Sequence, residues 1–459
     1  MSGVVYRALY HVAGVAVRWY YRQVAFDNTA RIPQRGPVLL VVNHPNELVD
    51  ALFAGLAARR QLTFTGKATL FANPVAAALL RYLKVVPLRR AKDEAGRDPS
   101  APPDPRRNAE AFAAIHDALR DGEAVLIFPE GLSWDEPRLA PLRTGAARIA
   151  LSARDDAGVR GLVIVPVGIN YERKDGVRSR VLVEVGEALA VDAWTGGDVD
   201  ALTAELSRRL HAVTLNFDDE HAADEVLDVA TVLAGVSDEV RPLGDEAPLH
   251  AMVAVARRAH EIRRRLAEGA LPPDTEQAVR RVQRRLVALR RTALRLGIRL
   301  DDVALDTTLV PSGRFVVREA LVTALGAPFA LWGRVNHWLP FTLARTIGAR
   351  TATGRTQPAM NTVLAGIVLV PLFYAAQTWL VHRVAGWPWS LAYAASLVPS
   401  ASWDLRFSDR WRRMQRRARA WAVFRDDPTL QAKLRDELFA LRDEAVRLGR
   451  GVSSLSGAA

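Results

Sequence analysis

The chain has 459 residues, enough for two or three structural units, and its 62 Lys and Arg against 50 Asp and Glu give a formal net charge of +12. An excess of basic over acidic residues favours partners that carry phosphate. Long apolar stretches and eleven tryptophans favour a membrane over nucleic acid as that partner. The absence of cysteine excludes a thiol nucleophile, a disulfide and a thiolate metal site.

Residues 1–23 predict an amphipathic helix. Arg7, His11 and Arg18 interrupt any apolar core, so the segment is not a cleavable signal peptide. Its tyrosines and tryptophan are typical of a helix at a membrane interface, and an ordinary packed amphipathic helix is the open alternative.

Residues 24–217 alternate between short apolar runs and longer amphipathic stretches, which predicts an α/β domain. Helices are expected at Arg106–Arg120 and Leu202–Asn216. The expected strands are residues 38–42, 62–65, 85–88, 124–128, 162–167 and 181–185.

Residues 218–310 are rich in Arg, Ala and Leu and predict a helical region. Asp274 and Gln277 have the spacing of a capping box at a helix start, and Gly297 is typical of a helix end. The arginines along this helix are interpreted as a solvated basic face, because aromatic residues that could stack on nucleic-acid bases are lacking.

Residues 311–403 read as a membrane region. Residues 356–381 and 384–403 carry no charged side chain, and only His382 and Arg383 separate them, so a transmembrane hairpin is predicted over 356–403. Residues 320–333 form a shorter apolar run that is either interfacial or re-entrant. Arginines on both outer flanks predict that both ends face the cytoplasm across the inner membrane.

Residues 404–459 form a basic tail on the cytoplasmic side. Leucines at helical spacing predict an amphipathic helix, for packing or for the membrane surface, and the sequence leaves that choice open. These leucines are Leu430, Leu434, Leu438, Leu441 and Leu448.

A histidine follows the buried strand 38–42, and an aspartate lies six residues further on. Pro45 suits the first turn of a helix, which leaves His44 in a cap position from which it can fold back towards Asp50. An aspartate bonded to one imidazole nitrogen fixes the tautomer and leaves the other nitrogen as a base. The plainer alternative is a helix-capping histidine and a separately satisfied aspartate.

Three further motifs follow strands. In F-P-E-G, Phe128 to Gly131, the chain turns sharply at Pro129 and Gly131, with Glu130 expected to be exposed between them. The strand 85–88 ends in two arginines, and V-P-V-G ends another strand around Pro166. Arg143 precedes Thr144 and Gly145 at an expected helix start. Each motif alone also fits a turn or a solvated basic patch.

Together these motifs resemble the glycerolipid acyltransferase family over roughly residues 25–190. The ordered blocks are N-H-x5-D at Asn43–Asp50, P-x-x-R at Pro87–Arg90, F-P-E-G at Phe128–Gly131 and V-P-V-G at Val165–Gly168. The spacing of five rather than four residues resembles the branch of glycerol-3-phosphate and dihydroxyacetone-phosphate acyltransferases. Trp134 and Arg143 depart from that branch, which often has histidine and lysine there.

The resemblance implies a mixed sheet flanked by helices and transfer of a fatty acyl group from acyl-CoA or acyl-carrier protein. The acceptor would be a hydroxyl of glycerol 3-phosphate or 1-acylglycerol 3-phosphate, in phospholipid synthesis, at a membrane phospholipid surface. No cofactor, metal or nucleic acid is expected. A non-catalytic membrane protein that keeps the fold to bind phospholipid or a partner is the alternative.

The resemblance also assigns roles to single residues. His44 is the expected general base and Asp50 its orienting partner. The remaining expected site residues are Arg90, Arg143, Arg89 and Lys67 for the phosphate, Glu130 and Gly131 for the acceptor pocket, and Asn43, Pro129 and Pro166 for local structure.

Overall fold

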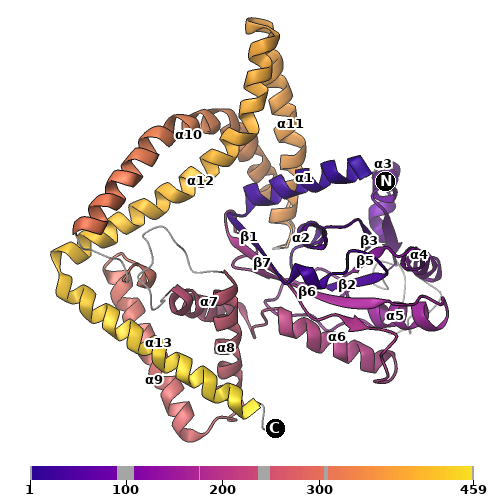
Figure 1. The fold of residues 1–459 in the computed structure, drawn as a ribbon, viewed down its shortest axis with the longest axis horizontal. Coiled ribbons are helices and arrows are strands. Elements are labelled where there is room, and N and C mark those ends of the chain that lie inside the picture. The colour runs from indigo at the N-terminus through magenta and orange to yellow at the C-terminus, as the bar shows by residue number, and fades with distance from the viewer. Residues whose placement is uncertain are drawn as a thin grey trace. The chain divides into compact units, whose positions relative to one another are not determined.

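The computed structural model describes residues 3–89, 108–174, 176–235, 249–303, 309–354 and 356–456 (Figure 1). The chain divides into two compact units. The first, here called the sheet unit, comprises residues 1–215 and 343–369. The second, here called the helical unit, comprises residues 216–342 and 370–459. Besides most of the predicted α/β domain 24–217, the sheet unit includes residues 1–23 and 343–369.

An eight-stranded mixed sheet organises the sheet unit, in the order β1-β7-β6-β2-β5-β3-β4 with β8 paired to β6. The five strands from β6 to β4 are parallel, whereas β7 and β8 run antiparallel to β6. The mixed sheet is therefore confirmed. The strands are β1 Gln23–Asp27, β2 Val38–Val42, β3 Leu62–Lys67, β4 Val85–Leu88, β5 Ala124–Ile127, β6 Val163–Tyr171, β7 Arg180–Val185 and β8 Leu189–Ala190.

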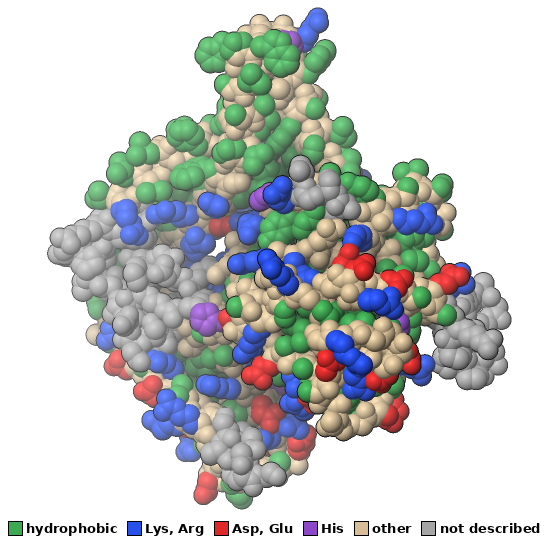
Figure 2. All heavy atoms as spheres, turned by 45° about the vertical axis from the view of Figure 1, so that its right-hand side comes forward, with side chains coloured by type: hydrophobic (Ala, Val, Ile, Leu, Met, Phe, Trp, Pro, Cys, Tyr) green, Lys and Arg blue, Asp and Glu red, His purple; other side chains and the backbone are tan. Residues whose placement is uncertain are grey.

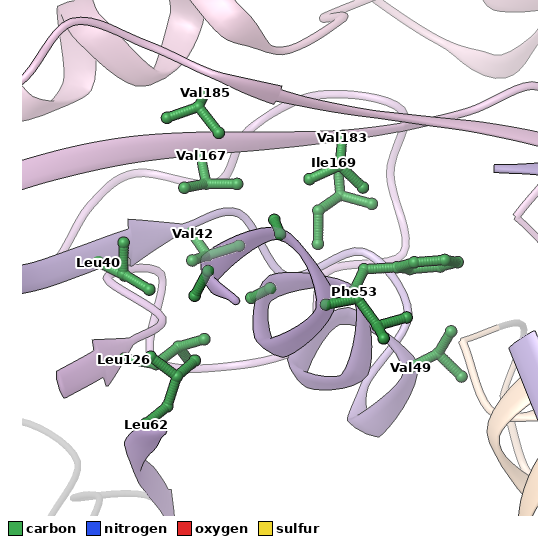
Figure 3. Close-up of a cluster of buried hydrophobic side chains, with 14 of the residues drawn as sticks. Leu40, Val42, Val49, Phe53, Leu62, Leu126, Val167, Ile169, Val183 and Val185 are labelled. Carbon is green, nitrogen blue, oxygen red and sulfur yellow. The ribbon is translucent and has the colours of Figure 1, made fainter. Parts of the chain in front are cut away.

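Helices cover both faces of this sheet because successive residues of the buried strands point to opposite sides. Leu40 and Val42 of β2 face α1, α2 and the start of α11. Phe53 of α2 belongs to the same buried cluster (Figure 3). Leu39 and Val41 face α4, α5 and α6. The helices of this unit are α1 Gly3–Tyr20, α2 Leu48–Ala58, α3 Pro74–Tyr82, α4 Ala109–Arg120, α5 Gly145–Asp155 and α6 Val199–Val213, with the short 3-10 helices η1 Thr29–Arg31 and η2 Ala68–Phe71.

Pro166 lies inside a strand, contrary to the prediction that the strand ends around it. Strand β6 continues to Tyr171. One edge of β6 pairs with β8 through Val163 and Ile164, and with β7 from Val167 onward. Pro166 lies between these two paired stretches, so neither β7 nor β8 pairs with it. The N–H that proline lacks therefore removes little hydrogen bonding on this edge of β6.

Long helices form the helical unit, and several sequence expectations can be compared with them. Helix α9 begins at Pro273 after Pro272, with no side-chain cap, so the capping box expected at Asp274 and Gln277 is wrong. Its predicted end at Gly297 is confirmed, with φ 66° there. The elements are α7 Glu220–Gly235, α8 Leu249–Ala267, α9 Pro273–Arg295, the 3-10 helix η4 Leu300–Asp302, α10 Leu309–Thr351, α11 Pro358–Ala385, α12 Trp387–Asp426 and α13 Pro428–Ser456, of which α10 and α11 also extend into the sheet unit.

The leucine stripe of the C-terminal tail is used for packing. Leu434, Leu438 and Leu441 of α13 are buried in one cluster with Leu289 of α9 and Phe424 of α12. The choice between packing and the membrane surface is thereby decided for these three leucines, because their side chains are enclosed by protein.

The predicted membrane region differs from expectation in its boundaries. The apolar run 320–333 is part of the continuous 43-residue helix α10. The stretch 384–403 is likewise not a separate segment, because α12 continues through the basic sequence to Asp426. Among the helices that the structure describes, α11 alone is long and apolar enough to cross a membrane.

Several polar side chains are buried among α10, α11 and α12, and many bulky apolar ones are exposed on these helices. Asn336 of α10 is buried; its side-chain oxygen accepts from the Tyr393 hydroxyl, and its backbone oxygen accepts a 3.1 Å bond from Gln377. His337, also buried, bonds to Tyr374. Figure 2 shows hydrophobic side chains over the outer part of α11 and α12. The exposed bulky apolar residues of the three helices include Phe329, Leu331, Trp338, Leu372, Trp379, Leu380, Trp387 and Trp389.

We expect Gly168→Ala to destabilise the sheet unit. A Cβ at this position of β6 would lie 2.1 Å from the backbone oxygen of Val213, which ends α6. Backbone cannot move aside as a flexible side chain can, so the change should lower the free energy of unfolding by about 1–3 kcal/mol or more. The measurement is the thermal unfolding midpoint of the full chain.

The matched control is Gly55→Ala in helix α2. Its added Cβ would come no nearer than 3.9 Å to another side chain, that of Phe64, and alanine is the better helix former. Equal midpoints for the two variants would contradict the proposed crowding at Gly168.

Candidate active site

The site begins where β2 ends. The Asn43 side chain continues the strand pairing with β6, since its amide nitrogen donates to the Ile169 oxygen (3.1 Å) and its oxygen accepts from the Ile169 nitrogen (2.7 Å). This buried double bond fixes the position of the next residue, His44. Asn43 was expected to support the local structure; in the fold its side chain bonds to the neighbouring strand β6.

The residues between Asn43 and α2 form a loop. Helix α2 begins at Leu48, so the prediction that Pro45 opens the helix is wrong. Glu47 precedes the helix with φ 48° and ψ −129°, a conformation that non-glycine residues rarely adopt. Surrounding contacts hold it there, including a 3.3 Å bond from its backbone N–H to the Ser133 hydroxyl.

The loop brings the predicted histidine and aspartate together. His44 Nδ1 lies 3.0 Å from Asp50 Oδ2. The His44 side chain is 17% exposed, whereas that of Asp50 is fully buried. Phe128 stacks on the imidazole with ring centroids 3.8 Å apart and an interplanar angle of 12°. With the ring fixed and Nδ1 donating to the carboxylate, Nε2 has its lone pair available to accept a proton.

Asp50 has two further donors. The backbone N–H of Asn46 donates to Oδ2 (2.6 Å), and the Tyr171 hydroxyl donates to Oδ1 (2.6 Å). Burial, together with the nearby Asp50 charge, raises the pKa of Tyr171 well above its usual value, which keeps this hydroxyl protonated. Three donors thus satisfy a carboxylate that has no access to water.

Glu130 is buried, contrary to the expectation that it is exposed. It is 2% exposed, Oε1 accepts from the His44 backbone N–H (2.6 Å), and Oε2 accepts from the Ala140 N–H (2.9 Å). Burial raises the pKa of this carboxyl, and the two N–H donors partly offset that effect. The turn residues around Glu130 suggested exposure, but the side chain points inward and joins the F-P-E-G loop to the histidine.

The F-P-E-G turn also positions Arg143. Gly131 has φ 70°, where glycine is favoured, and a Cβ there would lie 3.3 Å from Arg143 Cγ. The backbone N–H of Arg143 donates to the Pro129 oxygen (2.7 Å). Arg143 therefore lies beside the glutamate loop.

The other predicted cations share one edge of the sheet. Lys67 ends β3 and Arg89 follows β4, and both are exposed. The carboxyl ends of parallel strands meet at the same edge, where His44 also lies after β2. Arg90 lies outside the described residues.

Several residues of the site escaped the sequence interpretation. Tyr171 ends the same strand as V-P-V-G, and an aromatic hydroxyl at the end of a buried strand was the available signal. Ser133 donates to the His44 oxygen (3.1 Å), and the Trp134 N–H donates to the same oxygen (3.0 Å). Asn46 lies at one of the unspecified positions of the N-H-x5-D motif, and its contribution to Asp50 is a backbone N–H, which residue type does not reveal.

The fold and the site define an α/β domain in which a buried carboxylate orients a histidine at the carboxyl edge of the sheet. Residues 23–170 match the family model named Acyltransferase. Glycerol-3-phosphate O-acyltransferase 2 of Saccharomyces cerevisiae is 32% identical over 159 residues, which are 33% of this chain and 20% of that protein. A chloroplastic 1-acyl-sn-glycerol-3-phosphate acyltransferase of Arabidopsis thaliana is 23% identical over 34% of this chain and 38% of its own length.

Among solved structures, the 1-acyl-sn-glycerophosphate acyltransferase PlsC of Thermotoga maritima aligns with a TM-score of 0.33 and 17% identity, over 44% of this chain and 77% of that one. The chain spans between about a fifth and two fifths of the two curated relatives. Residues 23–170 are a domain of the Acyltransferase family, and the relatives that share it are glycerolipid acyltransferases. The predicted family is thereby confirmed.

We expect Tyr171→Phe to destabilise the sheet unit by removing one donor from the buried Asp50. Hydrogen bonds to charged groups contribute about 1.5–3 kcal/mol, so the unfolding free energy should fall by that order. The matched control is Tyr10→Phe, which removes the hydroxyl that bonds to the Leu56 backbone oxygen at 3.2 Å. A loss no greater than that of the control would argue against a charged Asp50.

Proposed function

We propose that the protein transfers a fatty acyl group from acyl-CoA or acyl-carrier protein to a hydroxyl of glycerol 3-phosphate or 1-acylglycerol 3-phosphate. The observation that supports it best is the 3.0 Å contact between His44 and the buried Asp50, beside the F-P-E-G loop. The relatives' names support the two acceptors, since one relative is named for each.

In the proposed reaction His44 acts as general base. Its Nε2 takes the proton of the acceptor hydroxyl while that oxygen attacks the thioester carbonyl. The C–S bond then breaks, the ester forms, and the thiolate leaves with a proton from the imidazolium. Asp50 stabilises the imidazolium during this transfer. A thioester is already activated, so no covalent intermediate on the protein is required.

The acceptor's phosphate would be held by cations at the same edge of the sheet. Arg143 is adjacent to the glutamate loop, and Lys67 and Arg89 end neighbouring strands. Guanidinium groups bind phosphate with paired donors, which suits the arginines at this position. Gly131 would shape the acceptor pocket, and Glu130 would act through the loop that it braces.

We further propose that α11 and the uncharged first part of α12, up to residue 403, form the predicted hairpin that anchors the protein in the inner membrane, with the sheet unit facing the cytoplasm. The length and apolar composition of α11 support a crossing, and the exposed apolar side chains of α10, α11 and α12 support contact with lipid. The arginines before residue 356 and after Asp404 support the cytoplasmic orientation.

We expect His44→Ala and Asp50→Asn each to reduce acyl transfer by at least about 10²-fold, the contribution typical of general-base catalysis. The assay combines purified full-length protein, labelled acyl-CoA or acyl-carrier protein, and a panel of acceptors, with the products identified by mass. His211→Ala, which changes an exposed histidine of α6, is the control and should retain full activity.

Wild-type turnover that persists in His44→Ala would remove the catalytic proposal. Wild-type protein that binds phospholipid but transfers no acyl group to any acceptor would favour the non-catalytic alternative.

We expect Leu372→Lys with Leu380→Lys to release the protein from membranes. Both leucines are exposed on α11, and a lysine in the bilayer interior costs about 2.5–3.5 kcal/mol each. The measurement is the fraction that stays in the membrane pellet after alkaline carbonate washing. Leu372→Ala with Leu380→Ala is the control and should stay in the pellet; retention of the lysine variant would contradict a crossing by α11.

A further inference from the structure

Helix α3 of the sheet unit turns an apolar stripe outward. Val75, Leu79 and Tyr82 are 78%, 57% and 47% exposed, and they occupy positions i, i+4 and i+7, so they share one face of the helix. Leu70 of the preceding η2 is 52% exposed and extends the stripe. The opposite side of the helix carries Ala77, which is buried. We call these four exposed residues the α3 surface.

The segment that carries this surface has basic but no acidic residues, and one of its cations, Lys84, forms an ion pair with Glu123. Residues 51–92 contain eight Lys or Arg and no Asp or Glu. Arg81 is exposed on α3 itself, with its guanidinium 5.9 Å from the centre of the Phe71 ring. Lys67 and Arg89, both exposed, flank the segment at the ends of β3 and β4. Figure 2 shows hydrophobic and basic side chains together at the upper right, where α3 lies.

The charge identifies the kind of partner that fits. Bulky apolar side chains on one face of a helix, with Lys and Arg around them, are the arrangement of helices that lie in the interface of anionic lipids. A nucleic acid would use the cations but would leave the apolar stripe in water. A protein partner would need an acidic rim around an apolar groove, whereas anionic lipid supplies both features in one surface.

The α3 surface is continuous with the edge of the sheet that carries the candidate site. Strand β3 leads directly through η2 into α3, and β3 pairs with β5, whose end leads into the F-P-E-G loop. Strand β5 in turn pairs with β2, which leads to His44. Contact at α3 would therefore bring this edge of the sheet towards the lipid headgroups.

We propose that the α3 surface inserts into the headgroup region of an anionic membrane, as a second lipid contact of the sheet unit in addition to α11. The proposal goes beyond the acyltransferase function and does not depend on it, because it rests on the exposure and charge of residues 67–89. Val75 and Leu79 would enter the boundary between headgroups and acyl chains, with Arg81 at the level of the phosphates.

The absence of native cysteine allows a direct test in the full-length protein. A single Val75→Cys reporter carries an environment-sensitive fluorophore, and the protein is reconstituted into vesicles that contain nitroxide-labelled lipids. The vesicles are phosphatidylcholine alone or phosphatidylcholine mixed with phosphatidylglycerol. We expect a blue shift and several-fold stronger quenching in the anionic vesicles, and a loss of that difference at high salt.

Two matched variants complete the test. Ala113→Cys, on an exposed position of α4 in the same unit, should show neither shift nor quenching in either vesicle. Val75→Glu with Leu79→Glu, read through an Ala78→Cys reporter, should abolish the quenching that the Ala78→Cys reporter shows alone. The Val75→Cys reporter in a His44→Ala background should behave as in the wild type, so failure of the proposed catalysis leaves the lipid contact testable.

Absence of quenching at residue 75 in both vesicles would overturn the proposal. Equal quenching in both vesicles would overturn the assignment to anionic lipid. A spectral change that requires added DNA or a soluble protein, rather than lipid, would also overturn it.

Discussion

The site depends on one buried charge. Asp50 is fully enclosed, and an enclosed carboxylate without donors would cost several kcal/mol. Its donors come from His44 and Asn46 after β2 and from Tyr171 at the end of β6, so these segments must keep their register for the domain to be stable. The same requirement that stabilises the fold therefore orients the histidine.

The sequence predicted the parts of this arrangement that are local. The apolar run 38–42 follows from strand composition, and the pairing of His44 with Asp50 was predicted from their spacing, although the helix start assumed for it at Pro45 was wrong. The loop itself could not be predicted, because Glu47 adopts its rare conformation through contact with Ser133, far away in sequence. Glu130 was misjudged for a related reason: its two donors, on His44 and Ala140, are brought to it only by the fold.

In the helical unit, too, contacts between residues far apart in sequence produce structure that the sequence alone did not predict. The apolar run 320–333 was predicted to be a short interfacial or re-entrant segment, and the polar residues Arg334, Asn336 and His337 follow it. In the folded chain those polar groups have partners: Arg334 forms a 2.9 Å ion pair with Asp404, and Asn336 and His337 bond to tyrosines of α12 and α11. Helix α10 therefore continues through them. A helix boundary inferred from polarity fails wherever the partner lies on another helix, which composition alone does not reveal.

The start of α11 is part of the sheet unit, and this has a consequence for the proposed reaction. Ala359 and Val363 are buried in the same cluster as Phe53 of α2, and the Thr356 hydroxyl bonds to Glu47, three residues before Asp50, at 3.3 Å. The first turns of the helix that would cross the membrane thus share a buried cluster with the helix that carries the site's carboxylate. Because removing an acyl chain from lipid costs about 0.8 kcal/mol per CH₂, the proposed reaction is favoured when the thioester end of the donor reaches the base while the rest of its chain stays in lipid, and a contact between the start of α11 and the segment that carries His44 suits that requirement.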